Sequence, residues 1–147
     1  MEKIKRVAIC GLLVFAVFLW LLLSAGETNA QVFCSDMTLK GVFGITWTGE
    51  RIDGGNPGLR CGVGLITMDG YGNLSGSATK SVNGVISQTT GTGTYTVNSD
   101  CTGSAITTDS DGEIRTHQFV IVEFGIEFFG IQTDAGRVIT FDAKRRL

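Results

Sequence analysis

Residues 73–97 read NLSGSATKSVNGVISQTTGTGTYTV, and this stretch predicts two antiparallel strands joined by a tight turn. The Asn83-Gly84 pair is the strongest two-residue hairpin signal, because both central residues of that turn need positive φ. On either side of it, apolar or small residues alternate with serine and threonine, which is the period of a strand with one face toward water. The stretch therefore predicts an antiparallel sheet.

The rest of the chain beyond residue 31 repeats this pattern of short strands between turn signals. No stretch of about 12 or more residues has helical periodicity there. We expect strands at residues 39–48, 60–68, 73–81, 85–97, 104–109, 113–124, 127–133 and 137–144. Short connections favour pairing in sequence order, and closure into a barrel removes the two exposed edges of such a meander. We therefore predict an all-β fold, a small barrel of about eight strands, with a two-sheet sandwich as the alternative.

The first 30 residues have the three parts of a secretion signal. MEKIKR is basic, residues 7–23 are uncharged and apolar, and small residues follow them. We expect cleavage after Ala30, with Gly26 as the second choice, which leaves residues 31–147 as a single barrel domain. The apolar run reaches the lower limit for a membrane-spanning helix, so the only membrane contact we expect is through an uncleaved signal. A periplasmic or an extracellular location follows from such a signal.

The region beyond the signal is weakly acidic. Cleavage would remove three bases and two acids from a chain whose net charge is −2. The one basic cluster, Lys144-Arg145-Arg146, is typical of a solvated tail. We therefore do not expect nucleic acid as a partner.

Three cysteines lie beyond the signal, an odd number for an oxidising compartment. Successive connections of a meander alternate between the two ends of the barrel. Cys34 precedes the first strand and Cys101 lies in the turn between the fourth and fifth, which places both at one end, whereas Cys61 lies at the other. We therefore predict a Cys34–Cys101 disulfide. We interpret Cys61 as a small buried apolar residue; the alternative is a reactive thiol or an intermolecular disulfide near the barrel mouth.

Four segments resemble a family of small secreted bacterial proteins. They are CSDMTLKGVFGI (34–45), DGYGNLSGSATKSVNGVIS (69–87), GTGTYTVNSDCTGS (91–104) and FVIVEFGIEFFGIQTDAGRVITFDAKR (119–145). The first, third and fourth contain, in order and spacing, the family motifs C-x-x-x-T-L-x-G-x-[YF]-G, G-x-Y-x-V-x-x-D-C-T-G and T-D-x-G-x-V. The family is similar in outline to the allene oxide cyclase-like barrels, which implies a barrel fold and no catalytic residues. The two family cysteines fall on Cys34 and Cys101, in agreement with the pairing reached above.

His117 is the only histidine, so a histidine-based catalytic or metal site would depend on it. Alternation places it on one strand face with Glu113 and Arg115. We interpret this trio as an exposed charged strip near a strand end; the alternative is an oriented acid–base histidine. With no second histidine and no C-x-x-C pair, we expect no metal site and no cofactor. Glu123 flanks the turn at Gly125, where a solvated carboxylate is more typical than a general acid inside the barrel.

An eight-stranded barrel is just wide enough to hold one small ligand. The candidate ligand contacts are Trp47, Tyr95, His117 and Glu123. For the rings, packing in the core is the more common role. The glycines that would leave room on the inner face are Gly44, Gly64, Gly76 and Gly93. The long connection at residues 49–59 is expected at one mouth of the barrel as a mobile lid.

Three functions fit these observations. The first is an exported barrel that binds a small apolar ligand. The second is a structural or self-assembling protein of the envelope or cell exterior, because residues 119–124 are apolar on both strand faces except at Glu123 and Cys61 is unpaired. The third is a cyclase-like or isomerase-like enzyme, which the barrel outline alone suggests and fold analogy supports weakly. Without a catalytic motif we favour a non-enzymatic role.

Overall fold

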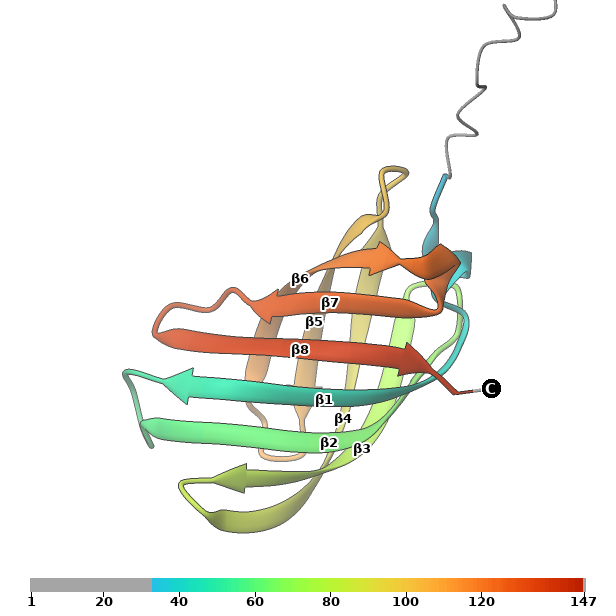
Figure 1. Cartoon of the computed structure of the whole chain (residues 1–147). Helices are drawn as coiled ribbons and strands as arrows, with labels where there is room; N and C mark the ends of the chain where they lie inside the picture. The colour runs from blue at the N-terminus through green and yellow to red at the C-terminus, as the bar shows by residue number, and fades with distance from the viewer. Residues whose placement is uncertain (1–32, 147) are drawn as a thin grey trace, which may run out of the picture. The chain divides into compact units, whose positions relative to one another are not determined.

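The computed structural model describes residues 33–146, which form a closed antiparallel barrel (Figure 1). Its strands are β1 (Gly41–Arg51), β2 (Gly58–Met68), β3 (Asn73–Val82), β4 (Val85–Val97), β5 (Thr102–Asp109), β6 (Ile114–Val122), β7 (Glu127–Gln132) and β8 (Arg137–Arg145). Each strand pairs with its neighbours in sequence, and β8 pairs with β1, so the sheet has no free edge. The predicted all-β barrel is confirmed. The predicted signal peptide, residues 1–30, and its cleavage site lie outside the described residues.

The hairpin of β3 and β4 forms as the sequence predicts. Asn83 and Gly84 both have positive φ, 51° and 86°, and Val82 pairs with Val85 across the turn. Such a turn matches the right-handed twist of the strands it joins. From Leu74 to Ala78 and from Gly91 to Val97 the apolar and small residues face the barrel interior, while the serines and threonines between them face outward.

The expected loop at 49–59 is shorter than predicted. β1 continues to Arg51 and β2 begins at Gly58, which leaves only residues 52–57 outside the strands. The pairing explains the difference, because Gly49 is bonded into the sheet on both sides, opposite Arg60 of β2 and Ile139 of β8. The glycines and charges of this segment favour a loop, but pairing on both sides overrides local preference.

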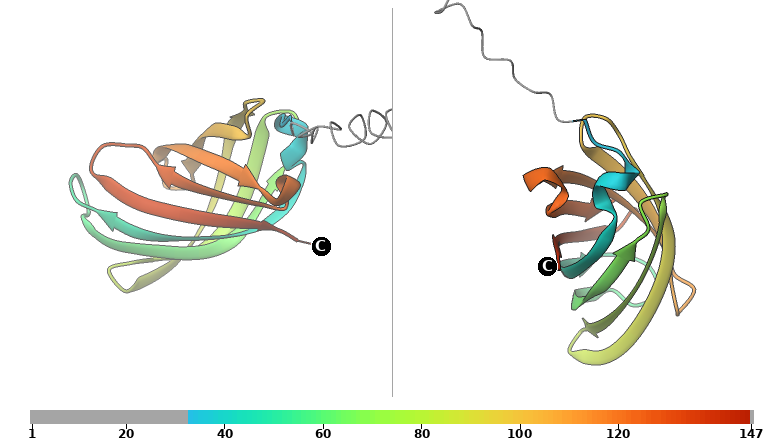
Figure 2. Two further views of the ribbon diagram at one scale, coloured as in Figure 1. Left: turned by 45° about the horizontal axis from the view of Figure 1, so that its top comes forward. Right: turned by 90° about the vertical axis from the view of Figure 1, so that its right-hand side faces the viewer.

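One end of the barrel is closed by two short 3₁₀ turns, η1 (Asp36–Leu39) and η2 (Glu123–Gly125), which Figure 2 shows at the near end in its right-hand view. Leu39 of η1 is fully buried, so it plugs this closed end. The Cys34–Cys101 disulfide joins the segment before η1 to the turn between β4 and β5. The predicted disulfide is therefore confirmed, and it fixes the plug to the barrel wall.

A cluster of aromatic rings fills the interior behind this plug. The Phe43 and Phe128 rings pack edge to face with centroids 5.3 Å apart, and Phe119 lies 5.4 Å from Phe128. Tyr95 is also buried there, and its hydroxyl accepts from the Gly70 amide at 3.0 Å and donates to the Asp36 carbonyl at 3.1 Å. These contacts satisfy its polar atom, as a buried tyrosine requires.

Three inward-facing rings each cover a glycine on the neighbouring strand. The directly opposed pairs are Trp47 with Gly62, Phe119 with Gly103, and Phe141 with Gly130. A Cβ atom at any of these glycines would overlap the opposing ring. The glycines thus leave space for rings that cross the interior, a known way to stabilise curved sheets.

The outer face of the barrel carries exposed apolar side chains. Val120 on β6 is 44 % exposed and Phe124 in η2 is 83 % exposed, so the described chain does not cover residues 119–124 on both sides. Strand β6 ends at Val122, because the next three residues, Glu123, Phe124 and Gly125, all have positive φ.

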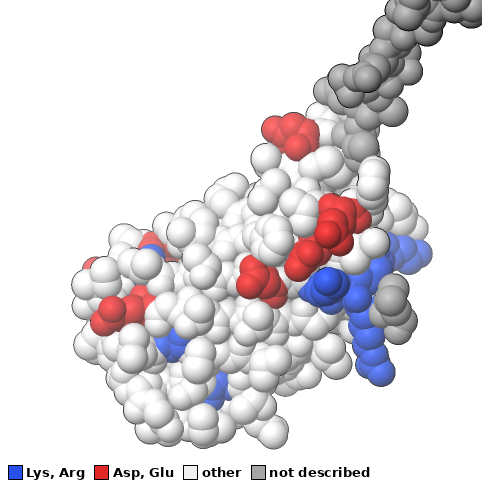
Figure 3. Space-filling model, viewed as in Figure 1, with Lys and Arg blue, Asp and Glu red and all other residues white. Residues whose placement is uncertain are grey.

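Figure 3 shows few charges over most of the face formed by β7, β8, β1 and β2. No helix within residues 33–146 is long and apolar enough to cross a membrane.

Candidate functional site

The barrel interior contains a cavity of about 200 Å³ between the closed end and the opposite end, here called the mouth. The mouth carries the connections β1–β2, β3–β4, β5–β6 and β7–β8. Gly76 and Ala78 of β3 leave room on one wall. The apolar side chains that line the cavity toward the closed end include Ile66, Met68, Leu74, Phe119, Phe128 and Phe141. The cavity therefore has an apolar floor within a rigid closed sheet.

The inner face changes from apolar to charged toward the mouth. On β8 the inward positions run from Ala143 and Phe141 through Ile139 to Arg137, and β3 reaches Lys80 in the same way. The inward cations at the mouth are Arg51, Arg60, Lys80, Arg115 and Arg137. Five strands thus each contribute one cation to the same end of the barrel.

Glu113 is the carboxylate around which three of these cations gather. It accepts from Arg51 at 3.0 Å, from Arg115 at 2.7 Å and from Arg137. Burial alone would raise the pKa of Glu113, but the hydrogen bonds and charges of Arg115 and Arg137 outweigh it and hold that pKa below its ordinary value. Glu113 is therefore ionised at neutral pH.

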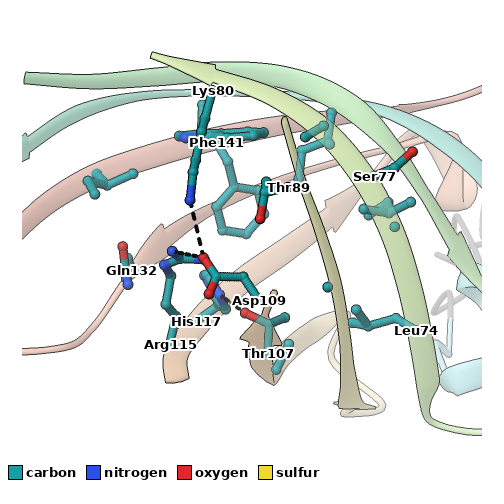
Figure 4. Close-up of a pocket in the computed structure, with 18 of the residues that line it drawn as sticks. Leu74, Ser77, Lys80, Thr89, Thr107, Asp109, Arg115, His117, Gln132 and Phe141 are labelled. Carbon is teal, nitrogen blue, oxygen red and sulfur yellow. Dashed lines mark hydrogen bonds and ion pairs between the residues drawn. The ribbon is translucent and has the colours of Figure 1, made fainter. Parts of the chain in front are cut away.

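Asp109 is the second inward carboxylate, and Figure 4 shows Lys80 and Arg115 reaching toward it from different strands. Its other oxygen accepts from the amides of Asp111 and Glu113, each at 3.1 Å, which shapes the β5–β6 turn. Burial raises the pKa of Asp109, but Arg115 and Lys80 outweigh burial and lower it. The pair of acids and their cations form one connected network across the mouth.

His117 lies inside the barrel beneath this network, and Figure 4 shows it beside Thr107. Its Nε2 is 3.0 Å from the Thr107 hydroxyl, and its ring packs edge-on against Phe141 at 5.6 Å. Burial, followed by the charge of Arg115, lowers the pKa of His117 to about 4. The imidazole is therefore neutral at pH 7.

The interpretation of Glu113, Arg115 and His117 as an exposed charged strip is wrong. Arg115 and His117 share the inner face of β6 and line the cavity, and Glu113, just before β6, is partly buried and pairs with Arg115 and Arg137. Glu113 and Arg115 can be buried at the mouth because their opposite charges compensate each other and both groups are hydrogen-bonded.

Three buried nitrogen atoms within residues 33–146 have no hydrogen-bond partner: Arg60 Nε, Arg137 Nη1 and His117 Nδ1. All three residues line the cavity. The two arginine nitrogens are donors, and the neutral imidazole nitrogen donates in one tautomer and accepts in the other. Unpartnered groups of this kind are uncommon in native interiors and call for an explanation.

The remaining predicted site residues fall in different places. Trp47 is half-buried and lines the cavity from β1, whereas Tyr95 belongs to the packed closed end. Glu123 is exposed in η2, as expected for a turn residue. The structure brings Trp47 and His117 to one cavity, and their role in binding stays a prediction.

Two positions face the opposite way from their prediction. Cys61 is exposed on the outer face of β2, so its interpretation as a buried residue is wrong. Gly44 also faces outward, opposite Leu65, while Gly64, Gly76 and Gly93 face inward. In β2 the glycines rather than the valine and leucine occupy the inner row, because Trp47 crosses the interior there.

Within the described part of the chain, no three His, Cys, Asp or Glu side chains lie together as metal ligands would.

No protein-family model matches the chain, and no curated protein matches it. The fold does resemble solved structures of redesigned β-barrels. One has a TM-score of 0.55 at 17 % identity, covering 82 % of this chain and 100 % of that barrel. The redesigned barrel mFAP1, solved bound to DFHBI, has a TM-score of 0.55 at 21 % identity, covering 79 % and 100 %. A third, mFAP0, also bound to DFHBI, has a TM-score of 0.50 at 20 % identity, covering 74 % and 99 %.

At these identities the likeness shows the fold alone, and the predicted resemblance to a bacterial family stays a prediction. Sequence reasoning also missed four cations of the mouth: Arg51, Arg60, Lys80 and Arg137. Each could have been recognised from the alternation of its strand, because it lies on the same inward-facing row as residues that line the cavity. Charged side chains are rarely buried, so a charged residue at an inward-facing strand position indicates a candidate functional site.

Proposed function

We propose that this barrel binds a small molecule with an apolar body inside its cavity. The observation that carries the proposal is the cavity of about 200 Å³, with an apolar floor and a charged mouth, enclosed in a barrel that has no free edge. An apolar protein cavity of about 150 Å³ is known to take up benzene. A space of this size therefore suits a ligand slightly larger than benzene or a chain of several carbons.

The comparisons support the proposal by analogy. Two of the similar redesigned barrels were solved bound to DFHBI, so a barrel of this outline is able to hold a small compound. We further propose that the domain acts after export to the periplasm or the cell exterior. The basic and then apolar start of the chain and the disulfide support this location, because disulfides persist in oxidising compartments.

A test uses 1-octanol as the probe and follows backbone amide shifts by NMR. We expect the shifts to concentrate on residues that line the cavity, such as Leu74 and Ile66. Ala78→Leu places a larger side chain in the cavity from β3 and should abolish the shifts. Ser75→Leu adds the same side chain to the outer face of that strand and should leave them unchanged. Equal effects of the two variants would reject binding inside the barrel.

Self-association is the second candidate function, and the outer face of β2 favours it. Cys61, Val63 and Leu65 form an exposed row there, with Val63 62 % exposed. A second copy of the chain would cover this row, and the two Cys61 thiols would form a disulfide by passing two electrons and two protons to a disulfide oxidant of the oxidising compartment. A native mass spectrum without reductant tests it: a dimer that reduction dissolves supports self-association, and a monomer at high concentration rejects it.

A further inference from the structure

We propose that the ligand of this cavity is an amphiphilic anion whose charged head, in its simplest form a carboxylate, is bound at the mouth by Arg60, Arg137 and His117. Its apolar chain would point toward the phenylalanine floor. The inference rests on the proposed function, because it names the chemical class of the molecule that the same cavity takes.

The charge balance of the mouth is the first argument. Five inward cations meet two inward carboxylates, Asp109 and Glu113, and a third, Asp111, which pairs with Lys80 at the rim and is 63 % exposed. Two further carboxylates lie in the connections at this end: Asp134 in the β7–β8 turn accepts from the Thr116 amide and hydroxyl and from Gln132, and Asp53 in the β1–β2 loop is exposed beside Gly136. The interior side of the mouth therefore carries surplus positive charge.

Arg60 is where this surplus is concentrated. Among residues 33–146 its side chain takes part in no ion pair, and the one hydrogen bond of its guanidinium group, at 2.7 Å, goes to the carbonyl of Asn56 in the β1–β2 loop. Burial is the largest influence that lowers the pKa of Arg60, and the charges of Arg51, Arg137 and Arg115 lower it further, against the opposing charge of Glu113. A cation that is destabilised by burial and by like charges is a site for an anion.

The unpartnered donors are the second and independent argument. Arg60 Nε and Arg137 Nη1 are buried against the cavity and donate to nothing, and His117 Nδ1 is unpartnered beside the same space. An anionic head accepts several hydrogen bonds at once, and guanidinium groups match a carboxylate in geometry and charge. A cationic head would instead be repelled, and a purely apolar ligand would leave the same donors unsatisfied.

The position of these groups also sets the orientation of the ligand. Arg60 and Arg137 lie at the mouth, His117 lies one layer deeper, and the rings of Phe119 and Phe128 lie beyond it. An amphiphile that enters by its tail would place its apolar chain on the floor and its head among the unpartnered nitrogens.

Octanoate and 1-octanol form a matched pair of probes that differ only in the charged head. We expect the full exported protein, with its disulfide intact, to bind octanoate about tenfold more tightly at pH 7 and low salt in calorimetric titrations, as one or two charge-assisted hydrogen bonds imply. Arg60→Gln should remove this preference while octanol still binds, which also shows that the variant folds. Arg60→Lys should keep most of the preference, and Lys144→Gln, which removes an exposed cation from the outer face of β8, should keep all of it.

The outcomes separate the two proposals. Binding of neither probe would overturn the proposed function, whereas equal binding of both would overturn only the anionic head. Equal loss of preference in Arg60→Gln and Lys144→Gln would also overturn it, because the effect would then come from net charge. As a second readout, octanoate but not octanol should raise the pKa of His117 from about 4, followed by NMR of the single imidazole. An unchanged His117 titration with octanoate bound would place the head elsewhere and reject the site.

Discussion

His117 makes the stability of this barrel depend on pH in a range where the carboxylates do not. Its pKa is lowered from 6.5 to about 4, chiefly because burial disfavours the charged imidazole. Between these two values the unfolded chain binds a proton that the folded chain excludes. The free energy of unfolding must therefore fall as the pH falls from 6.5 toward 4, and it is unaffected by His117 above that range.

The magnitude follows from the two pKa values. The full difference corresponds to about 3 kcal/mol, and about 2 kcal/mol of it is lost between pH 7 and pH 5. Asp109 and Glu113 also have lowered pKa values, so they stabilise the fold above their ordinary values near 4. Their contribution is lost only at lower pH, which leaves the interval from pH 7 to pH 5 to the histidine.

Urea denaturation at pH 7, 6 and 5 measures this loss directly. His117→Gln removes the titrating group while keeping a side chain that reaches Thr107, so its unfolding free energy should stay flat over the same interval. NMR of the one histidine checks the cause, because its resonances should titrate near pH 4 in the folded protein. An equal loss in wild type and variant, or a titration near pH 6.5, would refute the assignment of the effect to a buried neutral imidazole.

Two further predictions concern the packing that supports the cavity. Replacing Cys34 and Cys101 by serine opens a 67-residue loop and should lower the unfolding free energy by about 4 kcal/mol in the chain-entropy model; Cys61→Ser serves as the control in the same urea titration, and equal stabilities of the two would contradict the prediction. Gly130→Ala should lower the free energy of unfolding by about 1–3 kcal/mol, because the added methyl group would overlap the Phe141 ring. Gly55→Ala, in open space in the β1–β2 loop, should leave the melting temperature unchanged, and a similar effect of both substitutions would show that no overlap exists.

The fold was predictable because its signals are local. Asn83-Gly84 specifies a hairpin by its backbone preferences alone, and the alternation around it assigns the inner row of both strands without knowledge of any partner. Short connections then allow only a few strand orders, of which pairing in sequence order is the simplest. Closing such a meander into a barrel removes its two exposed edge strands, which favours the barrel. The Cys34–Cys101 pairing followed from the same alternation of the chain between two ends.

The mouth was not predictable in this way, because it is assembled from strands far apart in sequence. Arg60 and Arg137 approach each other only after β1 joins both β2 and β8 in a specific register. In β2 the local pattern was also ambiguous, since glycines alternate with larger apolar residues and either row fits a core. Which row faces inward is decided by Trp47, whose ring occupies the space over Gly62, and so Cys61 is exposed.

Inward arginines at the two ends of the barrel differ in how fully their hydrogen-bond donors are satisfied, and this difference bears on function. At the closed end, Arg145 donates to the carbonyls of Thr38, Lys40 and Gly125 and lies 4.8 Å from the centre of the Phe43 ring. A structural arginine in this fold thus has its donors satisfied by fixed backbone groups. Arg60 has one such bond, to a loop, and keeps a buried donor unpartnered over the cavity. Since stability alone would favour the first arrangement at both ends, the second supports the proposed anionic ligand, whose oxygens would complete it.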